Sequence, residues 1–450
     1  MKPDLRFFAD NWHLALRHVV SLLLWINFIC IVLFISNIAV LLLMALVGAA
    51  AFILPGRVRF TPMTALVIVF FIYMIGSDYI LFPTESGFGV YRRMLYAFFA
   101  GIGVYYVHKS KEAFFTIPLA LIVAAAFCIG MFFFQERIFV EGRLALFMGH
   151  PNNVSLVFSI SAISCLAALL HSPPGPGSRA ELVPDSLTPR LLQNRYVFLL
   201  LFLFCMWGIW LTSSRTSFYT TLIVCLLVAG GETCRRLGTG RGLLFFCGAG
   251  LLLGIVLSGF SPQLFRDASM QRMLGVISAP WEDITFRSRI PGWESALSAF
   301  CEQPLFGNGP ETFQATHEKY IEANYDRLVS ILGKDIVEQD TVRLPHAHNQ
   351  YLMFLAETGI VGLALFLALI VYPVWEGIRQ RSWYGVTIPL LLLFVLLGCL
   401  ESPFSGIRAG TAGISIFFMV LGYFSCACGQ DGKNTYGSKH THNNMLIQSY

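Results

Sequence analysis

The stretch Pro345-His346-Ala347-His348-Asn349-Gln350-Tyr351 marks the point where the only long polar segment of the chain ends and an apolar helix begins. Apolar sequence follows it, through Ala356-Glu357-Thr358-Gly359-Ile360-Val361-Gly362 and beyond. Ionisable side chains are rare at the boundary between lipid and water, and where they gather they usually bind a ligand or take part in chemistry. This junction therefore indicates both the fold class and the place of a functional site.

Outside this junction the chain is mostly lipid-soluble. Of its 450 residues, 56% are hydrophobic and only 13% are charged, and the mean hydropathy is +0.66. A soluble domain would carry roughly 25% charged residues. Each apolar stretch of about 20 residues predicts a membrane-spanning helix, so we expect an all-α polytopic membrane protein with about 12 transmembrane helices. The predicted spans are 18–37, 38–54, 62–82, 90–107, 112–134, 152–171, 196–212, 216–233, 242–260, 350–375, 384–400 and 410–427. Ten or eleven spans with a re-entrant piece remain an alternative, because the second stretch is short.

The distribution of lysine and arginine orients these spans. With the N-terminus in the cytoplasm, most basic residues of the short loops lie on the cytoplasmic side, as the positive-inside rule requires. The short loops on the opposite side hold Arg92, Arg93, Arg137, Arg143, Arg215 and Arg408. The same distribution places both ends of the chain in the cytoplasm, which requires an even number of spans. The segment 261–347 then faces the periplasm of a bacterium.

Four regions follow from this topology. Residues 1–260 hold transmembrane helices 1–9 with short loops, and 261–347 form a large periplasmic loop between spans 9 and 10. Residues 348–428 hold transmembrane helices 10–12, and 429–450 form a polar cytoplasmic tail. The net charge of +5 is mostly a topology signal, which gives no reason to expect nucleic-acid binding. The outward segments contain no Asp-x-Asp motif or carboxylate cluster at metal-ligand spacing, so we expect neither a metal nor a cofactor.

Arg215 is the most informative charge on the outward side. It lies in Thr212-Ser213-Ser214-Arg215-Thr216, a very short turn between two apolar spans, so its guanidinium must stay near the membrane surface. One interpretation is an arginine that reaches for phospholipid headgroups. The other is a clamp for an anionic ligand, and phosphate matches the planar donor fork of arginine best.

Three further arginines lie on the same side. Arg143 follows Glu141-Gly142, just ahead of a predicted span, and Arg287 and Arg289 lie in the long loop before Trp293. Because many acids accompany them, a loop salt bridge is an alternative for Arg289. A structural role is favoured for Arg287.

His348 has a special location at the junction. We expect the tenth span to begin near Asn349, which is a good N-cap residue. The partial positive charge of a helix N-terminus, together with a nearby arginine, disfavours imidazolium, so His348 is expected to stay neutral and accept a proton. A capping or packing role is the alternative. His346 lies outside the helix and is the weaker candidate base.

Two glycine patterns have structural interpretations. Gly307-Asn308-Gly309 lacks the third glycine and the strand–helix context of a dinucleotide site, so it predicts a tight turn. Gly359 and Gly362 are expected to permit close helix packing.

These motifs, in this order, resemble the O-antigen ligase and polymerase superfamily of integral-membrane glycosyltransferases. The resemblance rests on Thr212-Ser213-Ser214-Arg215, on Arg289-x3-Trp293 with Pro304-Leu305-Phe306-Gly307-Asn308-Gly309-Pro310, on His346-Ala347-His348-Asn349, and on Gly359. It covers roughly 140–365 by motif. It implies a GT-C-like fold and an enzyme of the bacterial inner membrane with its active site facing the periplasm.

The resemblance implies a donor glycan on undecaprenyl pyrophosphate and an acceptor hydroxyl on a lipid A–core sugar. The essential arginines of the family map onto Arg215 and Arg289, and Arg143 resembles another family position. Arg215 and Arg289 are then expected to hold the pyrophosphate, with His348 as the base of an inverting, metal-independent transfer. Arg143, Arg287, His346 and Asn349 are candidate substrate-binding residues. A single large loop favours a ligase.

Three other functions remain open. A polysaccharide polymerase and a protein O-oligosaccharyltransferase would share the donor and the arginine clamp. A transporter of lipid-linked glycans would also need outward arginines, although it predicts polar residues deep within spans and inverted repeats. The sequence does not identify the glycan or the oligomeric state.

Overall fold

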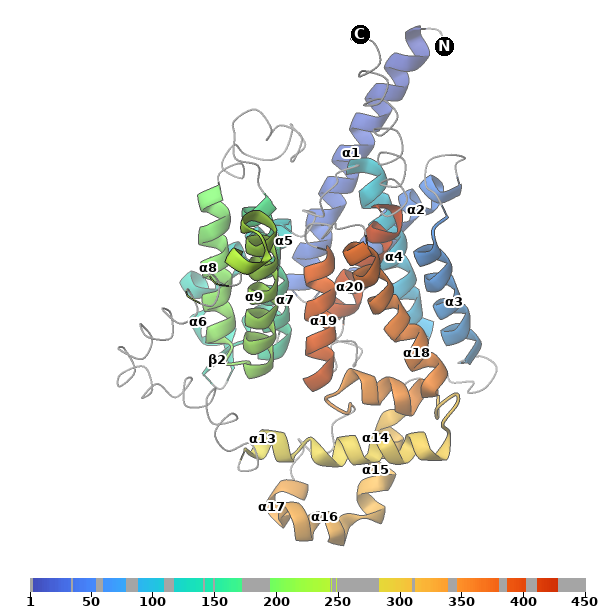
Figure 1. Ribbon diagram of the computed structural model, residues 1–450, viewed down its shortest axis with the longest axis vertical. Helices are drawn as coiled ribbons and strands as arrows, with labels where there is room; N and C mark the ends of the chain where they lie inside the picture. The colour runs from blue at the N-terminus through green and yellow to red at the C-terminus, as the bar shows by residue number, and fades with distance from the viewer. Residues whose placement is uncertain are drawn as a thin grey trace.

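A computed structural model describes residues 3–33, 35–53, 60–77, 88–108, 117–140, 142–148, 150–171, 195–242, 244, 248, 283–309, 312–338, 346–379, 387–401 and 411–427. Within these residues the protein is almost entirely helical, as predicted (Figure 1). The first part of the chain forms α1 (Pro3–Val32), α2 (Ile38–Ile53), α3 (Pro62–Gly76), α4 (Phe88–His108), α5 (Ile117–Phe133), α6 (Gln135–Ile138), β1 (Phe139–Val140), β2 (Arg143–Leu144), η3 (Leu146–Met148), α7 (Pro151–His171), α8 (Arg195–Leu211) and α9 (Arg215–Leu237). The second part forms α13 (Ile284–Arg287), α14 (Ile290–Glu302), α15 (Phe313–Ala323), α16 (Tyr325–Leu332), α17 (Lys334–Val337), α18 (Gln350–Arg379), α19 (Thr387–Leu400) and α20 (Thr411–Ala427).

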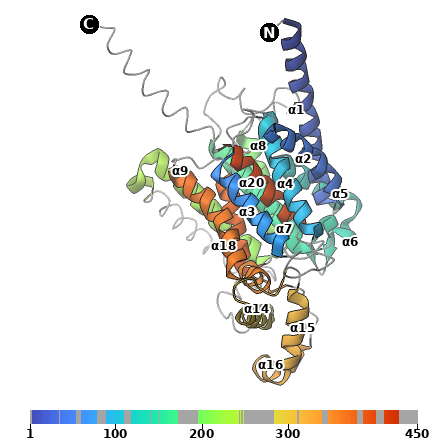
Figure 2. The ribbon, with the colours of Figure 1, turned by 90° about the vertical axis from the view of Figure 1, so that its right-hand side faces the viewer.

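The long helices form a bundle whose two ends differ. α13 to α17 lie beyond one end, which we call the loop end, and α14 runs across it (Figures 1 and 2). Arg215, at the start of α9, belongs to the loop end, whereas Leu237 and Arg379 mark the far end. By length and composition, three described helices could cross a membrane, over Pro151–Leu170, Arg215–Leu237 and Gln350–Gly377, and shorter apolar helices accompany them.

The predicted spans agree with the described helices except where the chain is not described. Eleven of the twelve coincide with α1–α5, α7–α9 and α18–α20, although α1 begins much earlier, at Pro3. The ninth predicted span, 242–260, and the first part of the predicted loop, 261–282, lie outside the described residues, apart from positions 242, 244 and 248. The count of twelve therefore stays a prediction.

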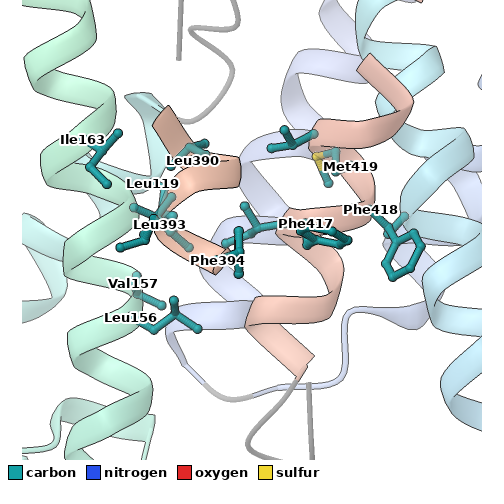
Figure 3. Close-up of a cluster of buried hydrophobic side chains, with 14 of the residues drawn as sticks. Leu119, Leu156, Val157, Ile163, Leu390, Leu393, Phe394, Phe417, Phe418 and Met419 are labelled. Carbon is teal, nitrogen blue, oxygen red and sulfur yellow. The ribbon is translucent and has the colours of Figure 1, made fainter. Parts of the chain in front are cut away.

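The core of the bundle is apolar and closely packed. α19 lies between α7 and α20, and Leu390, Leu393 and Phe394 contact neighbours on both sides (Figure 3). Small residues bring other helices together: a Cβ added at Gly101 of α4 would lie 2.0 Å from the carbonyl oxygen of Met419 in α20. Such packing of small residues is what holds helices together when lipid surrounds them.

α18 is broken, where the sequence predicts one continuous span. Gly359 has φ 64° and ψ −168°, which divides the helix into Gln350–Thr358 and a second part from Ile360 to Arg379. Glycine adopts this backbone conformation without the steric cost that a side chain would bring. Gly359 does permit a close approach, but by a turn and not by a helix as predicted: a Cβ there would lie 2.3 Å from the carbonyl oxygen of Leu305.

The turn at residues 304–309 satisfies the backbone groups that this break exposes. The carbonyls of Pro304 and Leu305 accept hydrogen bonds from the N–H groups of Ile360 (3.0 Å) and Val361 (3.3 Å). In return, the N–H groups of Asn308 and Gly309 donate to the carbonyls of Ala356 and Glu357, both at 2.9 Å. An unsatisfied backbone group costs several kcal/mol in lipid, so the turn and the break require each other. The tight turn predicted at Gly307 and Gly309, whose φ values are 70° and 104°, is confirmed.

Candidate functional site

Arg215 is presented by the short turn between α8 and α9. Ser213 in this turn has a left-handed φ of 49°, a conformation that non-glycine residues rarely adopt. The guanidinium of Arg215 makes a two-pronged ion pair with Asp283, and Nη2 lies 3.1 Å from Oδ1. Asp283 also caps α13 by accepting from the N–H of Phe286 at 2.9 Å. The pair therefore joins the membrane bundle to the start of the loop helices.

Arg289 is the N-cap residue of α14 and pairs with a carboxylate that the sequence did not single out. Its Nη2 lies 2.9 Å from Oε1 of Glu401, and the side chains are only 12% and 18% exposed. Glu401 directly follows α19, and its backbone carbonyl accepts from the N–H of Gln350 at 3.2 Å. The end of α19 is thus fixed to the start of α18 and to the start of α14.

His348 contacts the same carboxylate. Its Nδ1 lies 3.3 Å from Oε2 of Glu401, and its backbone has a left-handed φ of 50°. Asn349 is the N-cap of α18, as predicted: its Oδ1 accepts from the N–H groups of Tyr351 and Leu352, both at 3.0 Å. The amide nitrogen of Asn349 donates to the carbonyl of Cys399 at 2.9 Å. These contacts hold the imidazole of His348 against Glu401.

The charges around Glu401 keep it ionised. Burial alone would raise its pKa, but the hydrogen bond from His348 and the charge of Arg289 lower the pKa of Glu401 to about 2. The carboxylate beside His348 was not expected from the sequence. A carboxylate at Nδ1 favours the tautomer in which Nδ1 donates, which leaves the lone pair on Nε2.

His346 lies beside His348 in a drier environment. The two rings meet edge to face with centroids 4.3 Å apart. Burial, with contributions from His348 and Arg289, lowers the pKa of His346 to about 4, so this imidazole is neutral near pH 7. A neutral ring at this position leaves the charge balance of the site to the arginines and carboxylates.

Thr216 connects the two ion pairs. The residue follows Arg215, and its Oγ1 lies 3.5 Å from Oε1 of Glu401. The three residues predicted as catalytic, Arg215, Arg289 and His348, are therefore gathered at the loop end of the bundle around Glu401. We call Arg215, Asp283, Arg289, His348 and Glu401 the outer cluster.

Arg143 contacts the outer cluster indirectly, through the turn that carries Arg215. The hairpin of β1 and β2 pairs Val140 with Arg143 and turns at Gly142, which has a left-handed φ of 72°. From this position Nε of Arg143 donates to the carbonyl of Thr212 at 2.9 Å, and Nη2 lies 3.4 Å from Oδ1 of Asn152. Arg143 thus contacts the turn that carries Arg215.

Arg287 points to a different part of the molecule. Its Nη2 donates to the carbonyl of Leu332, the last residue of α16, at 2.5 Å. An arginine at a helix C-terminus satisfies a carbonyl that has no partner within the helix. No contact described for Arg287 joins it to the outer cluster.

The described residues hold no group of three His, Cys, Asp or Glu side chains placed to bind a metal ion. What gathers at the outer cluster is two arginines that can bind phosphate oxygens and a histidine oriented by a carboxylate. This combination can neutralise an anionic leaving group and accept a proton from a hydroxyl.

Glu401 and Asp283 are the residues that the sequence reasoning missed. Glu401 ends the apolar stretch 384–400 on the side predicted to face outward, and the rule that selected Arg215 applies to it equally. Asp283 had no such signal, because it is one of many acids in the long polar segment.

These features define a helical membrane protein with an arginine–carboxylate–histidine cluster at one end of its bundle. A family model described as O-Antigen ligase matches residues 199–367, a region that includes Arg215, Arg289 and His348. The match confirms the resemblance to the O-antigen ligase superfamily that the motifs predicted.

One relative with a curated sequence was also found. Over 99 residues the chain is 24% identical to an uncharacterized protein of Haemophilus influenzae, which covers 22% of this chain and 22% of that protein. The chain thus spans about one fifth of the length of this relative, whose name states no activity.

Proposed function

We propose that the protein is an O-antigen ligase of the bacterial inner membrane. In this proposal it transfers a glycan from undecaprenyl pyrophosphate to a sugar hydroxyl of lipid A–core at the periplasmic face. The observation that carries the proposal is the placement of Glu401, which contacts both Arg289 and His348. A cation for the leaving group and a base for the acceptor are thereby held on one carboxylate, at the end of the bundle where a lipid-linked donor would present its pyrophosphate.

His348 is the proposed base. Nε2 takes the proton of the acceptor hydroxyl while the hydroxyl oxygen bonds to the anomeric carbon of the donor. The bond between that carbon and the pyrophosphate oxygen breaks, and the electron pair leaves with the pyrophosphate. Because the acceptor attacks from the side opposite to the leaving group, the transfer inverts the anomeric centre. Glu401 orients the ring and stabilises the imidazolium that forms.

Arg215 and Arg289 are the proposed pyrophosphate ligands. Positive charge placed at a leaving oxyanion stabilises the transition state without a metal ion. Both guanidiniums pair with carboxylates, which compete with the donor pyrophosphate for them. Asp283 is the better candidate for replacement, because Glu401 is held by Arg289, His348 and Thr216 together.

The other candidate residues have supporting roles in this proposal. Arg143 holds the turn that carries Arg215, and Asn349 fixes the backbone of His348 as N-cap of α18. The imidazole of His346, neutral near pH 7, packs against the ring of His348 and can contact the acceptor. Arg287 acts at a distance by capping α16, so its removal should affect the loop rather than the chemistry.

The test is transfer by the purified protein in proteoliposomes, with a glycan on undecaprenyl pyrophosphate as donor and lipid A–core as acceptor. We expect wild type to form glycosylated lipid A–core and His348→Ala to lose at least about 10² in kcat, the range of general-base catalysis. Glu294→Gln is the matched control, because Glu294 pairs with Arg327 at an exposed position of the loop.

The products separate the proposal from its rivals. Extension of one lipid-linked glycan by another, without lipid A–core, would identify a polymerase. Movement of the donor between leaflets without any new glycosidic bond would identify a transporter. Full activity of His348→Ala would remove the base assignment and leave the ligase proposal to stand on its products alone.

A further inference from the structure

Two large apolar side chains are exposed at the loop end of the bundle. Leu305 is 58% exposed and Phe306 is 44% exposed, in the turn that follows α14. Single exposed apolar residues are common on protein surfaces. Leu305 and Phe306, however, are adjacent, and hydrogen bonds to α18 hold the backbone of their turn in place. Their exposure is therefore fixed by the fold, and the medium that they face matters.

The turn is fixed against the first residues of the second part of α18. The carbonyls of Pro304 and Leu305 accept from the N–H groups of Ile360 and Val361. Gly359 allows this approach, since any side chain there would collide with the backbone of Leu305 and Phe306. Leu305 and Phe306 therefore lie at the same level as Ile360.

Ile360 begins the stripe of α18 that faces lipid. Ile360, Leu367, Val371 and Trp375 are all exposed and apolar, at 49%, 38%, 59% and 54%. Their spacing of seven, four and four residues places them on one face of a helix. No described helix covers this stripe, and in a membrane bundle the medium that covers such a face is lipid.

The length of this part of α18 sets its depth. Its apolar part, from Ile360 to Trp375, has about 16 residues and spans about 24 Å, most of the hydrocarbon thickness of a bilayer. The Glu376–Arg379 ion pair marks the polar boundary at the far end. Ile360 then lies at the opposite boundary of the hydrocarbon, and the turn lies beside it.

We propose that the turn formed by Pro304, Leu305 and Phe306 inserts into the outer lipid leaflet and anchors α14 to the membrane surface. The partner is bilayer lipid, at the level where acyl chains meet headgroups. The surface is continuous with the lipid-facing stripe of α18, and two side chains offer far less area than the roughly 800 Å² per partner of a stable protein interface. Transfer chemistry plays no part in this inference.

The consequence concerns α14. Its first end is held by the ion pair between Arg289 and Glu401, and its last end would be held by lipid. The helix runs across the loop end of the bundle (Figures 1 and 2), so two anchors keep it parallel to the membrane surface. Arg289 is then held at headgroup depth, where a lipid-linked phosphate lies.

The experiment uses a photo-cross-linking amino acid, p-benzoylphenylalanine, in place of single residues of the full-length protein. Vesicles of phosphatidylethanolamine and phosphatidylglycerol are irradiated, and lipid adducts are measured by intact mass. Phe306 is the test position, and Val371 on the lipid-facing stripe is the positive control. Ile331 is the negative control, because it is 57% exposed on α16, and this helix lies beyond α14 and away from the bundle (Figure 2).

We expect lipid adducts at Phe306 to match those at Val371 and to exceed those at Ile331 by about tenfold, since only a side chain that lies among acyl chains contacts lipid continuously. Adduct yields at Phe306 equal to those at Ile331 would overturn the proposal. Cross-links from Phe306 to a second protein chain in place of lipid would overturn it as well. The aromatic replacement at Phe306 is conservative, so folding of the labelled protein is preserved.

Discussion

The two ends of the bundle use ion pairs in different ways. At the far end, two carboxylates pair within their own helices: Glu232 with Arg235 and Arg236, and Glu376 with Arg379. Those arginines are 61%, 56% and 59% exposed. At the loop end, Arg215 pairs with Asp283 and Arg289 with Glu401, and the arginines are only 13% and 12% exposed.

The difference separates arginines that follow topology from arginines that form a site. A pair three or four residues apart on a helix forms wherever the sequence permits it and contributes a few tenths of a kcal/mol. A half-buried pair between distant segments requires the fold to bring its partners together and carries a desolvation cost. Arginines of the second kind are the ones expected to meet a ligand.

The largest expected effect is the difference between breaking an ion pair at the loop end and breaking one at the far end. Removal of Arg289 takes away a pyrophosphate ligand and leaves Glu401 half-buried without its cation. We expect Arg289→Ala to lower kcat/KM for glycan transfer by about 10²–10³, the loss that follows removal of one group that stabilises a developing oxyanion. Arg379→Ala, at the far end, should change kcat/KM by about twofold or less. Equal losses from both variants would remove the distinction between the two ends.

The loop end should also be sensitive to acid. The pKa of His346 is lowered from 6.5 to about 4, so the unfolded state binds the extra proton and stability is lost as the pH falls from 6.5 through 4. The pKa of Glu401 is lowered from 4.5 to about 2, so its contribution is lost as the pH falls from 4.5 through 2. Each shift corresponds to about 3 kcal/mol.

Thermal unfolding in detergent between pH 7 and pH 3 measures this loss. His346→Gln should flatten the upper part of the profile and Glu401→Gln the lower part. A profile that neither variant changes would show that the loop end is not the source of the acid sensitivity.

A smaller effect is expected at Asp283. Asparagine keeps the N-cap of α13 but removes the charge that competes with phosphate for Arg215. We expect Asp283→Asn to tighten donor binding about tenfold, by about 1.5 kcal/mol, the lower end for a charge-assisted hydrogen bond. Binding of undecaprenyl pyrophosphate to the protein in nanodiscs measures this, with Glu294→Gln as control. Weaker binding would show that Asp283 shapes the site rather than occupying it.

The smallest effect should follow removal of divalent cations. Two arginines supply the positive charge at the proposed leaving group, so EDTA should leave the transfer rate within about twofold. The assay is the same proteoliposome reaction, with Mg²⁺ added back in a parallel sample. A rate that falls with EDTA and recovers with Mg²⁺ would give the leaving group a metal ligand.

Sequence patterns predicted the features that depend on neighbouring residues in the chain. Apolar length predicted eleven of the described helices, and the preference of asparagine for N-caps placed the start of α18 at Asn349. The rarity of charges at a membrane surface selected Arg215, Arg289 and His348. The structure brings them to one end of the bundle, where Arg289 and His348 contact Glu401 and Arg215 pairs with Asp283.

The sequence did not predict features that depend on distant segments. Glu401 is 112 residues from Arg289, and only the packing of α19 between α7 and α20 places it there. Gly359 breaks α18 because a turn some fifty residues earlier supplies its missing hydrogen-bond partners. The roles of the individual site residues in catalysis stay predictions.

The broken helix has a consequence for engineering. Since residues 304–309 and residues 356–361 complete each other's backbone hydrogen bonds, they form one exchangeable module. A chimera that takes only the loop from a relative would combine residues 304–309 of one parent with residues 356–361 of the other, and their backbone hydrogen bonds would no longer match. Chimeras meant to alter acceptor choice should therefore place their second junction after Gly362, so that the turn and the helix it completes come from the same parent.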